Sequence, residues 1–140
     1  MLKNFIPQRL AKQLKDLGFD QDCLAYWFEE SGISVPTETR GFWRNWNVMP
    51  RRISAPFWQQ ATEYFRTVHN LMASITFSAD PFVCYKVSIH DTTTYMVICT
   101  IHTYLATEYE GAELASLENL IRIVKERNSN KITNKITNDI

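Results

Sequence analysis

Glycine, cysteine and long apolar runs are all scarce in this chain of 140 residues, and each scarcity excludes a class of protein. With only four glycines, a glycine-rich loop that cradles phosphates is not expected. The three cysteines, Cys23, Cys84 and Cys99, are an odd number and too few for a secreted disulfide framework. The apolar runs are far shorter than a membrane span, and no signal-peptide pattern opens the sequence. We therefore expect a cytoplasmic protein with reduced thiols and no membrane partner.

Net charge is also absent, because 15 basic residues balance 15 acidic ones. The protein as a whole therefore has no electrostatic attraction to nucleic acid or to an anionic membrane. Sequence signatures of catalysis such as H-E-x-x-H and G-x-S-x-G are missing too, so neither a catalytic residue nor a cofactor is predicted. A hydrophobic content of 45% and an aromatic content of 13% are instead typical of a folded globule.

The chain does contain a helix, three strands and a second helix, in that order, between residues 55 and 127. Apolar stripes at helical spacing mark the two helices. Between them, residues 71–77, 83–89 and 95–101 alternate between apolar and polar side chains, as the strands of a half-buried antiparallel sheet do. The pattern predicts an α+β fold in which helices pack on one face of an antiparallel sheet.

A further helix and strand precede this core. Leucines at i, i+4 and i+7 predict a helix over residues 7–17, and an apolar run predicts a strand over residues 23–28. We expect residues 1–127 to form a single α+β domain around that core. Residues 128–140 are polar and include a tandem four-residue repeat at 130–137, so we expect this tail to be disordered.

The second and third strands of the core form a predicted hairpin whose register follows from parity. A three-residue loop at residues 91–93 pairs Val87 with Val97 and Val83 with Ile101, so that these four side chains face the helices. The residues expected on the opposite face are Lys86, Ser88 and His102.

Histidines and cysteines do not converge in this register. His90 and His102 lie eight positions apart, roughly 26 Å at about 3.3 Å per residue, which is too far to bind one metal. Cys84 and Cys99 have opposite parity, so neither a disulfide nor a thiol pair for zinc is expected. Cys23 has the pattern of a small core residue. No metal site is predicted.

The sheet face opposite the helices is not polar throughout. Exposed apolar groups that gather on a sheet usually mark a contact surface. We expect either the N-terminal segment or a second copy of the chain, in a homodimer, to cover this face. An enzyme acting on a small substrate at the same face is an alternative. The predicted protein-contact residues are Met96, Ile98, His102 and Tyr104.

Residues 40–52 interleave arginines with aromatic residues, and no acidic residue intervenes. Guanidinium groups fit phosphates and indoles stack on bases, so one hypothesis is a site for single-stranded nucleic acid or phosphate. The other is a loop whose aromatic side chains pack into the core while the arginines extend outward. The candidate contact residues are Arg40, Trp43, Arg44, Trp46, Arg51 and Arg52.

The α-β-β-β-α order over residues 55–127 resembles that of double-stranded RNA-binding domains. Those domains carry basic residues at the start of their last helix, whereas residues 107–113 (TEYEGAE) are acidic here and would repel a phosphate. The loop at residues 78–81 also lacks the histidine-containing groove-reading loop of that family. The resemblance therefore implies the shape of the fold and not an RNA ligand.

A second resemblance covers most of the chain and is carried by residues 14–19, 54–61, 64–66, 109–115 and 120–125 (LKDLGF, SAPFWQQA, YFR, YEGAELA and LIRIVK). Together these phrases resemble a group of uncharacterised small proteins of bacteriophages and integrated mobile elements of gut bacteria. The group has no assigned activity. The resemblance implies a non-enzymatic interaction or accessory protein, with nucleic-acid binding and catalysis on a small substrate as the alternatives.

Overall fold

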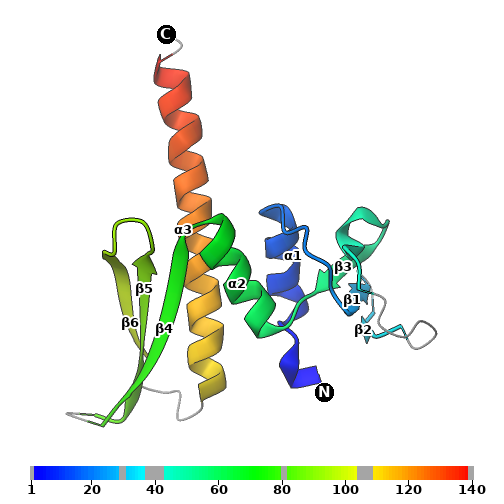
Figure 1. Cartoon of the computed structure of the whole chain (residues 1–140), viewed down its shortest axis with the longest axis horizontal. Helices are drawn as coiled ribbons and strands as arrows, with labels where there is room; N and C mark the ends of the chain where they lie inside the picture. The colour runs from blue at the N-terminus through cyan, green and yellow to red at the C-terminus, as the bar shows by residue number, and fades with distance from the viewer. Residues whose placement is uncertain (1, 29–30, 37–42, 80–81, 104–108, 139–140) are drawn as a thin grey trace. The chain divides into compact units, whose positions relative to one another are not determined.

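A computed structural model shows helices and antiparallel strands in both halves of the chain, which confirms the predicted α+β class (Figure 1). Contacts divide the chain into two compact units, Met1–Tyr64 and Phe65–Ile140. The residues that the structure describes are 2–28, 31–36, 43–79, 82–103 and 109–138.

The first unit combines a helix with a small antiparallel sheet in the strand order β2-β1-β3. The helix α1 confirms the prediction for residues 7–17, and β1 confirms the predicted strand, although it begins two residues later. In chain order the elements are the 3-10 helix η1 (Leu2–Asn4), α1 (Gln8–Asp16), β1 (Ala25–Phe28), β2 (Ile33–Ser34), the 3-10 helix η2 (Trp46–Val48), β3 (Arg52–Ala55) and the first part of α2 (Trp58–Val68).

The end of α1 shows how the sequence sets this unit's core. Leu10 and Leu14 lie one turn apart and are fully buried. Gly18 then adopts a left-handed φ of 88°, a conformation that suits glycine. In this cap the Gly18 N–H donates to Lys15 O (3.0 Å) and the Phe19 N–H donates to Leu14 O (3.0 Å). The cap turns the chain so that Phe19 is also buried.

The boundary between the two units falls inside α2. The helix–three strands–helix order expected over residues 55–127 is present along the chain. The contacts place the residues up to Tyr64 in the first unit and those from Phe65 in the second. The single domain expected over residues 1–127 stays a prediction. Ala55, the first residue of that predicted order, ends β3 and pairs with Ala25 of β1.

The second unit is a three-stranded antiparallel sheet in the order β4-β5-β6, with α3 packed on it (Figure 1). Its elements are β4 (Leu71–Ser78), β5 (Cys84–Asp91), β6 (Val97–Thr103) and α3 (Tyr109–Asn138). The helix packs mainly on β4 and β5 and touches β6 less. Fully or nearly fully buried apolar side chains from β5 and α3 form its core: Val87, Ile89, Leu117, Leu120, Ile121 and Val124.

The register of β5 and β6 differs from the one predicted. Val87 pairs with Ile101 and not with Val97, and Lys86 pairs with His102. The predicted register is therefore wrong, because the connecting turn is longer than the three residues expected.

The two faces of the sheet follow the predicted alternation only in part. Val87 is buried and Ile101 is half-buried, as expected for the helix face. Val83 and Val97 are both exposed, so their predicted burial is wrong. Val83 precedes β5, and a bulge beside His90 makes Val97 pair with that histidine. The residues that alternate with the buried positions, as predicted, are Lys86, Ser88 and His102.

The observed register also changes the distance between the two strand histidines. His102 lies opposite Lys86, four positions from His90 along β5, which is about 13 Å at about 3.3 Å per residue. The predicted separation of eight positions is therefore wrong. Across the described part of the chain, no group of three or more His, Cys, Asp or Glu side chains is placed to hold a metal ion.

The helix α3 continues to Asn138, through most of the tail that was expected to be disordered. Residues 128–137 are all exposed, and two threonines bond within the helix. Thr133 Oγ1 donates to Ser129 O (3.1 Å) and Thr137 Oγ1 donates to Thr133 O (3.0 Å). Because the packed half already nucleates the helix, each added residue gains a hydrogen bond at little further cost. Neither α3 nor another helix of the described residues is both long and apolar enough to cross a membrane.

Candidate protein-contact surface

Four consecutive apolar side chains are exposed where the chain leaves the β5–β6 turn and enters β6. The exposed fractions are 87% for Tyr95, 66% for Met96, 53% for Val97 and 39% for Ile98. Scattered single apolar residues are normal on a protein surface, but an uninterrupted exposed run of this length is not. The run therefore indicates a surface that contacts something else.

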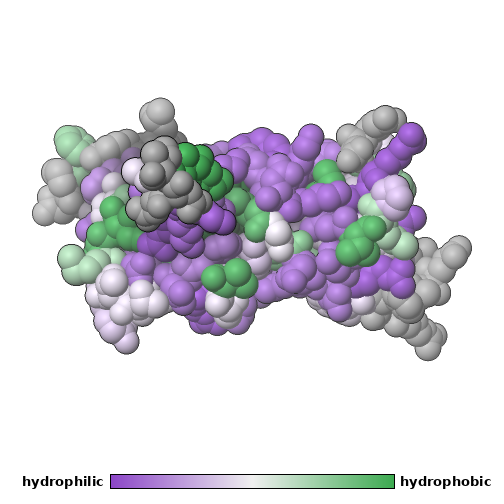
Figure 2. Space-filling view, turned by 90° about the horizontal axis from the view of Figure 1, so that it is seen from above, coloured by the Kyte–Doolittle hydropathy of each residue, from purple (hydrophilic) through white to green (hydrophobic). Residues whose placement is uncertain are grey.

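Another strand extends this run across the sheet. Met72 of β4 is exposed and pairs with His90, which in turn pairs with Val97, so the three side chains form one row. Figure 2, which views the molecule of Figure 1 from above, shows hydrophobic residues (green) at the surface on the side where the sheet of the second unit lies. We call the following five residues the hairpin surface: Met72, Tyr95, Met96, Val97 and Ile98.

This surface overlaps the protein-contact face expected from the sequence. Met96 and Ile98 belong to it. His102 is exposed, but it lies four residues farther along β6. Tyr104 lies outside the described residues. The sequence predicts Tyr95 inside the strand at 95–101, with the parity of the core residues Val97 and Ile101, whereas β6 begins only at Val97. The signal that points to Tyr95 is the uninterrupted apolar run in the sequence.

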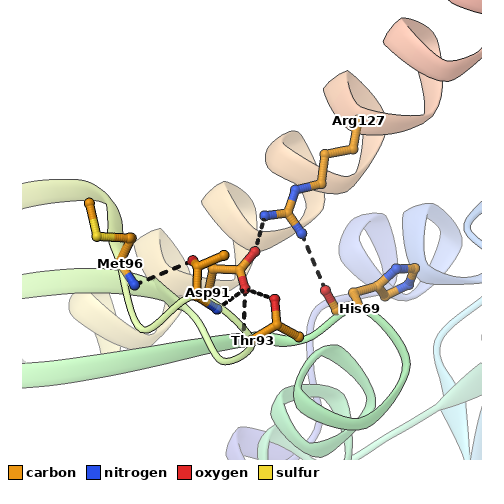
Figure 3. Close-up of polar contacts among 6 residues, drawn as sticks. His69, Asp91, Thr93, Met96 and Arg127 are labelled. Atoms are coloured by element: carbon orange, nitrogen blue, oxygen red, sulfur yellow. Dashed lines mark hydrogen bonds and ion pairs between the residues drawn. The ribbon is translucent and has the colours of Figure 1, made fainter.

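Asp91 organises the turn that carries the hairpin surface (Figure 3). Its Oδ1 accepts hydrogen bonds from the backbone N–H groups of Thr93 (2.9 Å) and Thr94 (3.1 Å) and from the Thr93 hydroxyl. An aspartate that accepts such bonds from the backbone N–H groups that follow it forms an Asx turn. The Asp91 N–H donates to Met96 O (2.9 Å), which closes the turn.

Arg127 ties this turn to α3. Its Nη2 donates to the other carboxylate oxygen of Asp91, Oδ2, at 2.7 Å, and its Nη1 donates to His69 O at 3.3 Å (Figure 3). The bonds from Thr93, then that from the Thr94 N–H and that from Arg127, hold the pKa of Asp91 well below its ordinary value. The carboxylate is therefore ionised at neutral pH, and the bond to Arg127 is charge-assisted.

The backbone at Tyr95 shows that the exposed run is held in place. Tyr95 has a φ of 59°, in the left-handed region that bulky side chains rarely adopt. Holding such a residue there costs about 1–2 kcal/mol, and the surrounding hydrogen bonds must offset this cost. These hydrogen bonds belong to the Asp91 turn on one side of Tyr95 and to the β5–β6 pairing on the other. The hairpin surface is therefore both apolar and preorganised.

The arginine- and tryptophan-rich stretch lies in the first unit and has a different character. Trp46 is 5% exposed, and its Nε1 donates to Cys23 O at 2.8 Å. The guanidinium groups of Arg44 and Arg52 each lie over the Trp46 ring, 5.4 Å from its centroid. Arg52 also lies 4.6 Å from the centroid of Tyr26. Trp46 is therefore a core residue, and two guanidinium groups of its own chain lie over its ring.

The backbone of this stretch is fixed to β3 and to the loop after α1. The Trp46 N–H donates to Ser54 Oγ (3.0 Å), and the Ser54 N–H donates to Asn47 Oδ1 (2.9 Å). Asn47 Nδ2 donates to Phe19 O (2.8 Å). The structure thus brings together three of the six candidate residues, Arg44, Trp46 and Arg52, and uses them in packing.

The other three candidates in this stretch do not join that cluster. Trp43 is 46% exposed, with its ring 6.2 Å from that of Phe57. Arg51 is exposed and has a left-handed φ of 58°. Arg40 lies outside the described residues. Trp43 and Arg51 are therefore the described candidates that remain available at the surface.

The cysteines are free thiols, and two of them are buried. Burial raises the pKa of Cys23 to about 12, with a smaller contribution from the charge of Asp22. The Cys23 thiol therefore stays protonated at neutral pH and is a poor nucleophile, as expected for a small core residue. Cys84 is buried, and Cys99 is partly exposed on β6.

Comparisons with protein-family models, with curated proteins and with solved structures find no match for this chain.

Proposed function

We propose that this chain is a non-enzymatic interaction protein, of the accessory kind that phages and mobile elements encode, and that it binds another protein chain through the hairpin surface. One observation carries the proposal: an exposed apolar run held in a fixed conformation. Tyr95, Met96 and Val97 are more than half exposed, while Asp91 and Arg127 fix the turn beside them. Preorganisation lowers the entropic cost of binding.

The composition of the surface supports a protein ligand. Tyrosine and methionine are enriched in protein interfaces, because tyrosine offers a large contact area and methionine adapts its shape. Residues 92–103 contain no Asp, Glu, Lys or Arg, so the surface offers no charge for recognising a phosphate. Burial of apolar area is therefore the driving force that these residues provide.

Nucleic-acid binding through residues 40–52 has weaker support. Base stacking needs an open aromatic face, and Arg44 and Arg52 already lie over the ring of Trp46. Trp43 and Arg51 would have to carry such a site together with residues outside the described part of the chain. A stacking site built on one exposed indole and one exposed arginine is a small one.

Photo-crosslinking from the hairpin surface tests the proposal. A benzoylphenylalanine placed at Tyr95 in the full chain, irradiated in cells that express it, should give discrete adducts with protein. The matched control carries the same probe at Ile132, an exposed apolar residue of α3, and should give few adducts. Equal adduct yields at both positions would contradict the proposal. Adducts that nuclease removes would support the nucleic-acid alternative instead.

A further inference from the structure

The strand β6 is the least covered strand of the second unit's sheet. It lies at one edge of the order β4-β5-β6, and all seven of its residues are described. None of them is buried, although Val97, Ile98, Cys99 and Ile101 are apolar. In β5, by contrast, three residues are buried. The cause is that α3 packs mainly on β4 and β5, which leaves β6 half covered on its inner face.

The edge also lacks the features that normally keep edge strands from pairing. Natural edges carry lysine, proline or inward-pointing charges. Residues 92–103 contain no proline and no Asp, Glu, Lys or Arg, and the bulge beside Val97 affects only the first residues of the strand. Two identical edges necessarily bring identical charges together, so the absence of charge suits pairing with a second copy in particular.

We propose that the partner at this site is a second copy of the chain, which pairs antiparallel along β6 to form a continuous six-stranded sheet. This inference rests on the proposed function, because it names the protein that covers the start of β6. Pairing of the whole strand with its copy places Thr100 opposite Thr100. A seven-residue strand is about 23 Å long at about 3.3 Å per residue, enough for a full ladder of main-chain hydrogen bonds.

The two-fold symmetry of this dimer covers the inner face of β6, which α3 leaves half covered. A two-fold axis perpendicular to the sheet places both α3 helices on the same face, side by side across the joined β6 strands. On that face Cys99 of one copy lies opposite Ile101 of the other, so the half-buried inner residues of β6 become a shared core. On the outer face Ile98 lies opposite His102, and part of the hairpin surface is covered.

The opposite edge strand, β4, is the natural control. Its first residue, Leu71, is fully buried, and α3 packs on it as it does on β5. Thr76 of β4 is exposed on the same outer face as Thr100, opposite Lys86. A glutamate at either position adds a negative charge to one edge strand of the sheet, opposite Lys86 at position 76 and opposite Ser88 at position 100.

Light scattering of the purified full chain over a range of concentrations tests the inference. The unsubstituted chain should reach twice the 16.4 kDa of the monomer. Thr100→Glu should weaken the dimer by about tenfold or more, because two like charges then lie directly opposite each other. Thr76→Glu should leave it unchanged. A chain that remains monomeric at all concentrations overturns the inference, and so does a dimer that only Thr76→Glu disrupts.

Disulfide formation between two copies tests the register of the proposed β6–β6 pairing. Thr100→Cys in a Cys99→Ser background should form a covalent dimer under mild oxidation, because Cβ atoms directly opposite in antiparallel strands are about 4.5–5.5 Å apart. Thr76→Cys in the same background should stay monomeric, and Cys23 and Cys84 are buried. A dimer linked through position 76, or none through position 100, overturns the inference.

Failure of this inference differs from failure of the proposed function. A monomer whose probe at Tyr95 crosslinks to a different protein retains the proposed function and excludes the second copy. A dimer that forms through β6, with no protein adduct from Tyr95, retains the pairing and excludes the hairpin surface as a binding site.

Discussion

Residues 43–52 and 91–98 both mix aromatic or apolar side chains with polar ones, and the structure uses them in opposite ways. In the first, Trp46 is buried, donates its N–H to a backbone carbonyl and is covered by two guanidinium groups. In the second, Tyr95 projects outward from a turn that Asp91 and Arg127 hold. The difference shows that hydrogen bonding, more than composition, separates a structural aromatic residue from one that is available for binding.

Replacing each tryptophan of the first region gives the largest expected effect. Trp46→Ala removes a buried ring and its hydrogen bond and should lower the free energy of unfolding by about 3–5 kcal/mol. Trp43→Ala, the matched control at a half-exposed indole, should cost well under about 1.5 kcal/mol, as partly exposed positions do. Urea denaturation of both variants measures this. Equal losses of unfolding free energy would mean that Trp43 contributes as much to the core as Trp46 does.

Substituting Asp91 tests what holds the second region. Asp91→Ala removes all the bonds that its carboxylate accepts, whereas Asp91→Asn keeps an oxygen for the Thr93 and Thr94 N–H groups and loses the ion pair with Arg127. Hydrogen exchange at those two amides should therefore be fastest in Asp91→Ala, intermediate in Asp91→Asn and slowest in the original chain. Unchanged exchange in Asp91→Ala would mean that the turn does not depend on this residue.

The left-handed backbone at Tyr95 separates stability from binding. The free energy of unfolding should be about 1 kcal/mol higher for Tyr95→Gly than for Tyr95→Ala, because alanine keeps the strain of a positive φ and glycine does not. Both variants lack the ring and should lose binding equally. Thermal melts and the crosslinking partner's affinity measure the two effects. If alanine is as stable as glycine, the conformation at position 95 is not strained.

The smallest expected effect is a pH dependence that belongs to the second region alone. Burial, then the charges of Arg127 and Lys131, lower the pKa of His69 below its ordinary value of 6.5. The unfolded chain therefore binds a proton that the folded chain does not, so stability falls as the pH drops below about 6.5. His69→Gln should flatten this part of the profile. Thermal melts between pH 7 and pH 5 report it, and an identical slope in the variant would exclude His69.

Asp91 acts in a separate and lower pH range. Its folded-state pKa is depressed, so its contribution is complete above the ordinary value of 3.8 and is lost as the pH falls from there toward the folded pKa. The two titrations therefore do not overlap between pH 7 and pH 5. This separation makes the His69 measurement interpretable.

The sequence predicts the elements of both regions better than it predicts how they are joined. Alternation in β4, β5 and β6 and the leucine spacing of α1 identify those elements, because burial on one face leaves a period in the sequence. The β5–β6 register was wrong because the turn contains neither glycine nor asparagine. Its length depends on the bonds of Asp91 and on a tyrosine at positive φ; an aspartate indicates a turn but not its length, and a tyrosine does not indicate a positive φ.

The candidate surface was predicted in part for the same reason. The alternation places Met96 and Ile98 on the outer face and Val97 on the core face. The bulge beside His90 shifts the pairing of Val97 and leaves it exposed. For Trp46 the sequence left two alternatives open, since a ring that stacks on a base and a ring that fills a core have the same composition. Only the partners of its N–H and of its faces distinguish them.

The uninterrupted run of α3 from its packed half to Asn138 has a geometric consequence. At about 1.5 Å per residue, the eleven residues after Arg127 extend the helix by roughly 16 Å. A continuous helix has no hinge, so the direction of this extension is set by how residues 112–124 lie on the sheet. A spin label at Lys135 would therefore report any tilt of α3 as a displacement much larger than the movement at the core itself.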